Sequence, residues 1–485
     1  MYMSVRKLIL VSFVFSLTLL AGTLPLRAQD EPQPPVEGKP KPAGASTPIP
    51  ITNPGDIQNA AEDVTNNLTP DITPLTGALT PTLGSPETLH SYWVPGIQWS
   101  GSIQSNGYSQ TQNSGWLMNN FILGNLSVLQ VWRRSELAVN YSAGGFISSD
   151  SSQGNGYSQQ LAISQTFHWN RWLLQLNDQF SYLPQTSLGF GSGTGLGNPG
   201  VGGPVGPVIP GIGNSYVPNQ GIYSAVGPRY SNSAVVQLTY TTSPRGSITM
   251  SGSYGLLDFV NSGNIDSDFT TGTIGYNYTF TRQDSFGAFY RFSAYHYSGE
   301  PQANGDHSFN FAYSRKLTGR LALQIYAGPD FITSRISTNG NSLAYGVNVG
   351  ASLSYGAKNG GLSGAYSHGI SNGSGVLAGS TADQLNFGAN HKLNRIWSAQ
   401  FNLGFAHNAA LNTGIQTTSQ SFNTWTVGGG LSRPAGRNGT LAIAYNADLT
   451  DYGQAGCVGT ACSSNQVYNY VTINFQWHTR PLILP

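Results

Sequence analysis

Residues able to carry out catalysis are sparse in this sequence and form no recognisable active-site motif. A glycine pattern of the dinucleotide-binding type, GxGxxG, occupies residues 195–200, but it contains Pro199 and no helical sequence follows it, so nucleotide binding is not expected. Ser367 and His368 are the closest approach to a nucleophile beside a base, yet consecutive strand residues point to opposite faces and cannot pair directly. We therefore expect no enzymatic activity, no catalytic residue, no metal and no cofactor.

The two cysteines, Cys457 and Cys462, lie close together in the segment CVGTAC. The N-terminal signal described below implies an oxidising compartment, where a nearby cysteine pair most often forms a disulfide. A metal site would need further ligands at suitable spacing, and none lie nearby in the sequence. A disulfide that closes this loop is the favoured interpretation.

A larger set of polar side chains recurs at alternate positions of apolar segments. From Leu343 to Tyr355 one parity is apolar, whereas the other consists of Ala, Gly, Asn and Ser. A strand with this pattern has one apolar face and one small, polar face. The side chains that the alternation places on the polar face, as candidates for lining a pore, are Arg291, Asn348, Ser352, Gln400, Asn402, Asn446, Asp448, Asn474, Gln476 and Gln237. Most are neutral amides and hydroxyls, which suit contact with carbohydrate but also simply tolerate water.

The two-residue period predicts about 18 strands, with 16 as the alternative count. They lie near 96–108, 116–130, 136–148, 157–168, 172–182, 232–242, 247–258, 267–281, 285–297, 307–316, 320–332, 343–356, 361–369, 382–392, 396–408, 422–432, 440–449 and 467–478. The parity is confused in 116–130. In 172–182, Asp178 falls on the apolar face unless a bulge shifts it.

The composition excludes several classes of protein. Charged residues make up 9% of the chain and aromatic residues 11%, whereas ordinary soluble domains carry about 25% charged residues. A barrel that shows lipid an apolar face and keeps neutral polar groups inside needs few charges. The net charge is +1 and no basic stripe is present, so nucleic acid is not an expected partner.

The N-terminal residues predict export. Arg6 and Lys7 precede an apolar run at 8–20, so residues 1–28 are predicted to be a signal peptide, with an uncleaved membrane anchor as the alternative. Residues 29–91 are rich in proline and keep no period, which predicts a largely disordered periplasmic linker that either binds a periplasmic partner or is merely unstructured. No long apolar stretch follows, so a helical membrane protein is excluded.

The connections between the predicted strands alternate in length. Tight turns such as 132–134, 170–171 and 394–395 follow every second strand, and longer loops rich in Gly, Ser, Asn and Asp fill the alternate positions. Bacterial outer-membrane barrels have short periplasmic turns, long external loops and an even number of strands. Nearly every short turn carries Lys or Arg, while the acids, among them Asp306, are expected mostly in loops. These cations either meet anionic headgroups or are simply solvated.

Residues 183–231 form the longest predicted connection. The core of this loop, GFGSGTGLGNPGVGGPVGPVIPGIGN, is so rich in Gly and Pro that neither strand nor helix is expected in it, and Arg229 is the sole charge of the connection. A long structureless loop is usually functional or disordered. Its position resembles that of the third loop of general porins, which folds into the lumen. The loop is expected either to form a neutral constriction or to be a mobile external loop.

Over residues 92–480 the chain resembles bacterial outer-membrane β-barrels of the porin class, through its signal, its alternation and its loop rhythm. The last strand resembles the aromatic C-terminal signal read by barrel-assembly machinery, although residues 481–485 continue as a tail. The resemblance implies an all-β, transmembrane, antiparallel up-and-down β-barrel in the outer membrane, with membrane lipid and small solutes as partners. It leaves the subfamily and the oligomeric state undefined.

Passive diffusion of small neutral or sugar-like solutes through this channel is the expected function. Two alternatives remain open from the sequence. One is an export pore for a polysaccharide, with residues 29–91 docking a periplasmic partner. The other is a closed structural or adhesive barrel whose loops bind ligands outside the cell.

Overall fold

The computed structural model describes residues 91–105, 116–149, 155–183, 189–190, 222–223, 228–260, 265–281, 283–298, 302–318, 320–336, 340–357, 359–371, 377, 379–411, 421–451, 465–480 and 482–483. The predicted signal peptide, the linker as far as residue 90, both cysteines and most of the loop from 183 to 231 lie outside these residues. The described residues all belong to one compact unit, which spans residues 53–485. No helix among them has the length and apolar character needed to cross a membrane.

The described chain forms antiparallel strands, 18 of which are long. These are β1 (Tyr92–Ser105), β2 (Leu117–Val131), β3 (Ser135–Ser148), β4 (Gly156–His168), β5 (Trp172–Leu183), β8 (Arg229–Ser243), β9 (Gly246–Phe259), β10 (Ser267–Thr279), β11 (Asp284–Tyr297), β12 (Gln302–Thr318), β13 (Leu321–Ile336), β14 (Gly340–Ala357), β15 (Gly360–Ser371), β16 (Ser380–Lys392), β17 (Ser398–Ala410), β18 (Ser421–Pro434), β19 (Gly439–Asp451) and β20 (Asn465–His478). Three further strands have two residues each: β6 (Gly189–Phe190), β7 (Ile222–Tyr223) and β21 (Leu482–Ile483).

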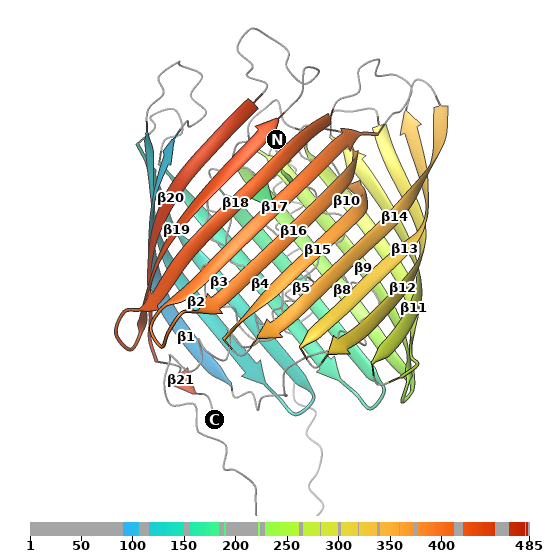
Figure 1. The fold of residues 1–485 in the computed structure, drawn as a ribbon, viewed down its shortest axis with the longest axis horizontal. Coiled ribbons are helices and arrows are strands. Elements are labelled where there is room, and N and C mark those ends of the chain that lie inside the picture. Colours follow the sequence, from blue (N-terminus) through green and yellow to red (C-terminus); the bar gives the residue numbers. More distant parts are fainter. Residues whose placement is uncertain are drawn as a thin grey trace, which may run out of the picture. The chain divides into compact units, whose positions relative to one another are not determined.

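The long strands close into a barrel (Figure 1). Each pairs with its neighbours in sequence, β5 pairs with β8 across the longest connection, and β1 pairs with β20. The first and last strands therefore meet, with Gly96 opposite His478 and Ser105 opposite Asn469. Because backbone N–H and C=O groups have no water partner in hydrocarbon, such closure is what lets a sheet span a membrane. The predicted 18-stranded up-and-down barrel is confirmed.

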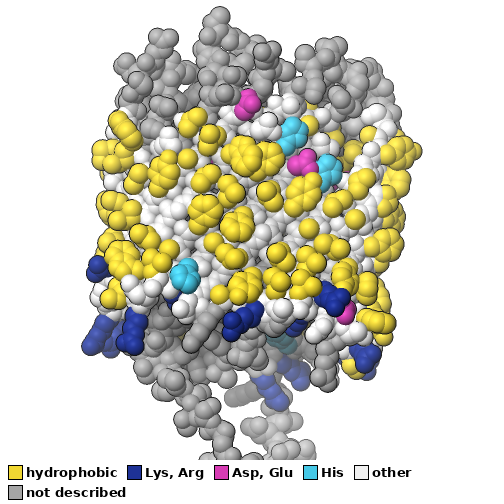
Figure 2. Space-filling view, in the orientation of Figure 1, with side chains coloured by type: hydrophobic (Ala, Val, Ile, Leu, Met, Phe, Trp, Pro, Cys, Tyr) yellow, Lys and Arg dark blue, Asp and Glu magenta, His cyan; other side chains and the backbone are white. Residues whose placement is uncertain are grey.

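The outer surface of the barrel is apolar, as the two-residue period predicts (Figure 2). On β14 the side chains of Leu343, Tyr345 and Val347 are exposed by 54–74%, whereas Asn348 is 2% exposed. On β20 the outward set Val471, Ile473, Phe475 and Trp477 alternates in the same way with buried polar residues. A closed sheet with lipid-facing and interior-facing residues in alternation is the architecture of outer-membrane β-barrels.

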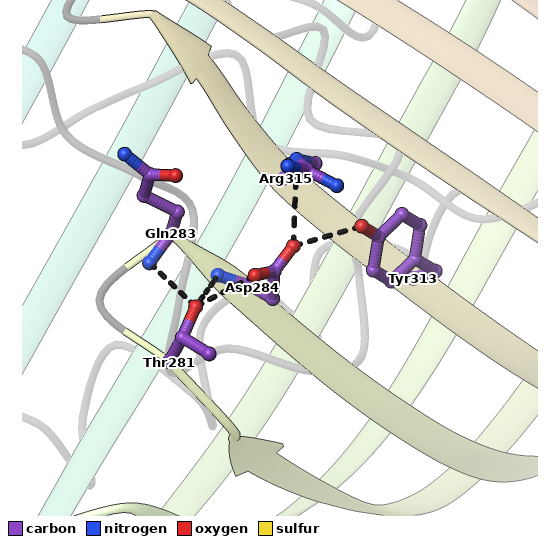
Figure 3. Close-up of polar contacts among 5 residues, drawn as sticks. All are labelled: Thr281, Gln283, Asp284, Tyr313 and Arg315. Atoms are coloured by element: carbon purple, nitrogen blue, oxygen red, sulfur yellow. Dashed lines mark hydrogen bonds and ion pairs between the residues drawn. The ribbon is translucent and has the colours of Figure 1, made fainter.

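One short turn shows how the strands are joined at the periplasmic end (Figure 3). The Thr281 hydroxyl donates to Asp284 Oδ2 at 2.6 Å and accepts hydrogen bonds from the backbone N–H groups of Gln283 and Asp284. Asp284 Oδ1 accepts from the Tyr313 hydroxyl at 2.8 Å and lies 3.6 Å from Arg315 Nε. Thr281 therefore closes the β10–β11 turn, while Asp284 connects it to β12.

Cations gather at the end of the barrel that carries the short turns (Figure 2). Described members of this set are Arg133, Arg134, Arg171, Arg245, Arg315, Lys316, Arg320, Lys392, Arg395, Arg433 and Arg437. The Arg433 guanidinium lies 5.4 Å from the centre of the Trp397 ring, a cation–π contact at the same edge. The basic residues predicted in the short turns thus lie at one end of the barrel.

Two strands with weak patterns have specific explanations. β2 is apolar on both faces because Phe121, Leu123 and Leu129 point inward and are buried in small apolar clusters. In β5 no bulge shifts the register at Asp178, so this residue keeps the outward parity that the sequence predicts for a strand without a bulge. Its carboxylate is nevertheless buried and accepts a hydrogen bond from Asn232 Nδ2 at 2.9 Å.

The strands β12, β13 and β14 are longer than predicted. They continue towards the external end, so that only residues 298–301 and 337–339 separate β11 from β12 and β13 from β14. The expectation that Asp306 belongs to a loop is therefore wrong, and Asp451, which lies beyond the predicted strand 440–449, is the last residue of β19. The ladder between β12 and β13 lacks pairs at Pro329, which has no N–H to donate.

The long loop differs from expectation at both of its ends. Gly189 and Phe190, at the start of the Gly- and Pro-rich core, form β6 and pair with β7, so the expectation of no strand there is wrong. Ile222 and Tyr223 supply the β-branched and aromatic residues that favour this ladder. Arg229, which was predicted to lie in this loop, is instead the first residue of β8 and is buried. The predicted constriction or external loop lies outside the described residues.

The two faces of β17 give a direct test of the barrel's orientation. Leu403 points outward and Asn402 inward, and both are half-buried. Leu403→Arg is expected to destabilise the folded barrel by about 2–4 kcal/mol, because it places a charge against hydrocarbon near the midplane. Asn402→Arg is the matched control and should leave stability nearly unchanged. Urea titration of folding in phosphatidylcholine vesicles measures both; equal losses would contradict the assignment of the two faces.

Candidate functional site: the barrel interior

The ten side chains predicted on the polar parity all lie on strands, on the face opposite the outward apolar residues. Seven of them are buried: Arg291, Asn348, Ser352, Asn446, Asp448, Asn474 and Gln476. Gln400 is exposed, and Asn402 and Gln237 are half-buried. The sequence therefore predicts the face of each residue, but not that most of them are covered.

The most accessible amides of the interior wall lie on β16 and β17. Asn386 and Gln400 are exposed there, and Asn390 and Asn402 are half-buried. The register of the two strands groups these amides, because Asn390 lies opposite Gln400 and Gly388 lies opposite Asn402. Each amide offers both a donor and an acceptor. The result is a neutral hydrogen-bonding surface, which we call the amide patch.

Two members of the amide patch, Asn386 and Asn390, were not predicted. Both alternate with Leu385 and Phe387, which are exposed on the outer face, so the signal that identified the other residues was present here as well. The backbone N–H of Gly361 donates a hydrogen bond to Asn390 Oδ1, which fixes that amide against β15.

A glycine makes room for the neighbouring amides. Gly428 lies between Asn402 on β17 and Asn446 on β19 in the strand register. A Cβ atom at position 428 would collide with both amide side chains. Glycine at this position therefore lets two amides from strands on either side of β18 turn towards each other.

A cluster of charges occupies the interior face of β11, β12 and β13. One terminal nitrogen of Arg291 lies 3.5 Å from Asp306 Oδ2, and both side chains are buried. The Asp330 carboxyl lies close enough to interact with both of them. Two carboxyl groups thus adjoin one guanidinium where little water reaches, and a charge that loses its partner in such a place is costly. We call these three residues the charge cluster.

Sequence reasoning identified only Arg291 of the charge cluster. Asp306 was assigned to a loop because the strand was predicted to begin at residue 307, although its parity matches that of the inward Ser308 and Asn310. The pairing of Arg291 with Asp306 depends on the register between β11 and β12, which one sequence does not define. No three His, Cys, Asp or Glu side chains among the described residues are grouped to hold a metal ion.

Comparisons with known proteins give matches in structure but none in sequence. No family model matches the chain, and no curated protein matches it in sequence. Solved structures that resemble it include OccAB3 of Acinetobacter baumannii (9% identity, 80% of this chain and 99% of that chain, TM-score 0.40) and OpdQ of Pseudomonas aeruginosa (11%, 81% and 100%, 0.40). A BenF-like porin of Pseudomonas fluorescens is similar over 80% of this chain and 98% of that one, with 7% identity and a TM-score of 0.40.

These scores are too low to transfer a function. The class of the protein rests instead on its own geometry, namely a closed antiparallel barrel of 18 strands with an apolar outer surface and a polar interior. Only outer-membrane β-barrels combine these features, because hydrocarbon requires both closure of the sheet and an apolar outer face. The chain is a multi-pass β-barrel protein of the Gram-negative outer membrane.

The charge cluster predicts opposite effects for two substitutions. Arg291→Met leaves the buried Asp306 and Asp330 without their cation and is expected to lower the free energy of unfolding by about 3–5 kcal/mol. Asp330→Asn keeps the shape of the side chain and removes the second acidic group, so it should preserve or raise stability at neutral pH. Urea unfolding in phosphatidylcholine vesicles compares the two variants. Similar losses in both would show that packing, rather than charge balance, governs this cluster.

Proposed function

We propose that the protein is an outer-membrane channel for the passive diffusion of small neutral polar solutes, with sugars as the most suitable class. The observation that carries the proposal is the amide patch, a water-accessible and uncharged part of the interior wall. Amides donate to and accept from hydroxyl groups without favouring either sign of charge. Barrels of 16–18 strands in general leave an aqueous channel.

The charge cluster fits the same proposal because it is covered. Arg291, Asp306 and Asp330 are each at most 4% exposed, so a solute that follows the amide patch meets few charges. Weak ion selectivity is therefore expected. Three features predicted from the sequence belong to the same proposal. The signal peptide (1–28) directs export, residues 29–91 form a periplasmic linker, and the Cys457–Cys462 disulfide closes the loop that contains it.

A closed structural or adhesive barrel is the second candidate. The burial of seven of the ten predicted inward side chains favours it, since an open channel would expose more of its wall. The two candidates differ in whether solutes cross the membrane, so a transport measurement separates them. Swelling of liposomes in sugars of graded size should occur with the smallest sugars if the channel is open, and its complete absence would favour the closed barrel.

The amide patch predicts the effect of a bulky residue in the channel. Gly388 faces the interior beside Asn402, and Gly388→Trp is expected to reduce single-channel conductance in planar bilayers to about half or less of that of the unchanged protein. Gly364→Trp is the matched control, because Gly364 lies on the outer face opposite Phe387 with no atom closer than 3.9 Å to an added Cβ. Equal conductance of the two variants would show that the amide patch does not line the conducting path through the barrel.

A further inference from the structure

The charges of β16, β17, β18 and β19 are separated between the two ends of the barrel. The structure describes this part of the chain at residues 379–411 and 421–451. Its acids lie among the four residues at the external end of a strand, namely Asp383, Asp448 and Asp451. Its Lys and Arg residues all lie at the periplasmic end, namely Lys392, Arg395, Arg433 and Arg437. The periplasmic end of these strands therefore carries positive charge that no acid of the same strands balances.

Two neighbouring turns hold these cations. Residues 393–397 join β16 to β17, and residues 435–438 join β18 to β19. Trp397 lies one residue beyond the periplasmic end of the β17–β18 ladder, where Ser398 pairs with Ser432. Arg433 Cζ lies 5.4 Å from the centre of the Trp397 ring, a cation–π contact that links the two connections. We call residues 392–397 and 433–438 the basic turn pair.

Hydrogen bonds fix the shape of both turns. Asn394 Oδ1 accepts from the backbone N–H groups of Ile396 at 2.9 Å and Trp397 at 2.8 Å. In the other turn, Asn438 Nδ2 donates to the backbone carbonyl of His478 at 2.9 Å. The cations thus stand on a backbone of defined conformation. Such preorganisation lowers the entropy that is lost when a ligand binds.

The arginines of the basic turn pair are not neutralised by described side chains. Arg395, Arg433 and Arg437 form no ion pair with any described residue. At another turn of the same end, by contrast, Arg315 lies 3.6 Å from the carboxylate of Asp284. Guanidinium groups match phosphate and carboxylate through paired N–H donors. The basic turn pair therefore suits an anionic group that comes from outside the described chain.

Apolar side chains at the same turns indicate what kind of molecule carries the anion. Leu393 and Ile396 flank Arg395 in the sequence and are 56% and 55% exposed. The outward faces of β17 and β18 continue from here as the lipid-facing wall, with Phe401 and Leu431 exposed. Figure 2 shows Lys and Arg side chains along the lower edge of the barrel, below hydrophobic ones. A soluble anion gives no reason for exposed Leu and Ile, whereas a phospholipid presents an anionic head and acyl chains together.

We propose that the basic turn pair is a docking surface for anionic phospholipids of the periplasmic leaflet, with phosphatidylglycerol as the type. The phosphate is bound by Arg395, Arg433 and Arg437. Trp397 lies at the boundary between headgroups and hydrocarbon, and the acyl chains follow the outward faces of β17 and β18. This surface concerns the lipid around the barrel and does not depend on the proposed diffusion channel.

A photocrosslinking residue at the first turn tests the surface. p-Benzoylphenylalanine replaces Ile396, the full chain is refolded in phosphatidylcholine vesicles that contain a minority of phosphatidylglycerol, and crosslinked lipids are identified by mass spectrometry. Phosphatidylglycerol is expected to be enriched about fivefold over its share of the bilayer, and added salt should lower this enrichment because it screens charge. The same probe in place of Tyr345, which is exposed near the external end of β14, should crosslink both lipids in proportion. Proportional crosslinking at both positions would overturn the proposal.

Two variants separate this surface from a general attraction of surface cations. Arg395→Gln combined with Arg437→Gln should lower the enrichment at the Ile396 probe from about fivefold to below about twofold. Arg335→Gln is the control, because Arg335 is exposed near the external end of β13, at the opposite end of the barrel from the probe. It should leave the enrichment unchanged. Equal enrichment in the double variant and the unchanged protein would contradict the role of the turn cations.

A soluble competitor distinguishes a lipid from a free phosphate ester. Glycerol 3-phosphate in excess, at matched ionic strength, should leave the lipid crosslinks in place, and their full displacement would overturn the assignment to lipid. If the double variant does not fold, as judged by heat-modifiable mobility in gels, the salt dependence and the comparison of the two probe positions still decide. Conductance to sugars, measured separately, reports only on the axial channel.

Discussion

The constraint on which this structure depends is the satisfaction of every backbone hydrogen bond in a medium without water. A sheet meets it only by joining its first strand to its last, as β1 and β20 do from Gly96 to Ser105. Closure then divides all side chains into an outward and an inward set. Low charge content, aromatic outer faces and a polar interior follow from that division.

Most of the fold could be predicted because the constraint acts on a two-residue period that the sequence displays directly. The stretch from Tyr345 to Leu353 illustrates this, since its more exposed and more buried positions match the alternation of its residue types. Prediction failed where alternation carries no information. The external ends of β12, β13 and β14 were predicted too short because the polar residues near those ends also suit loops. Asp306 was therefore assigned to a loop instead of to β12. The inward Phe121 and Leu123 of β2 depend on apolar partners that periodicity does not reveal.

Contacts between strands explain why the candidate site could be predicted only in part. Parity gives the face of Arg291, but its partner Asp306 follows from register. Likewise His368 was dismissed beside Ser367, whereas its actual partner, Asp383, lies directly opposite on β16. Burial is a further unknown, because it depends on everything that surrounds a side chain. Whether an inward polar residue is accessible, as in the amide patch, or covered, as in the charge cluster, therefore could not be predicted from the sequence.

The same constraint gives meaning to the places where the barrel departs from it. Asp178 keeps an outward parity, but Asn232 supplies a hydrogen bond and the pair is buried, so the departure is compensated within the sheet.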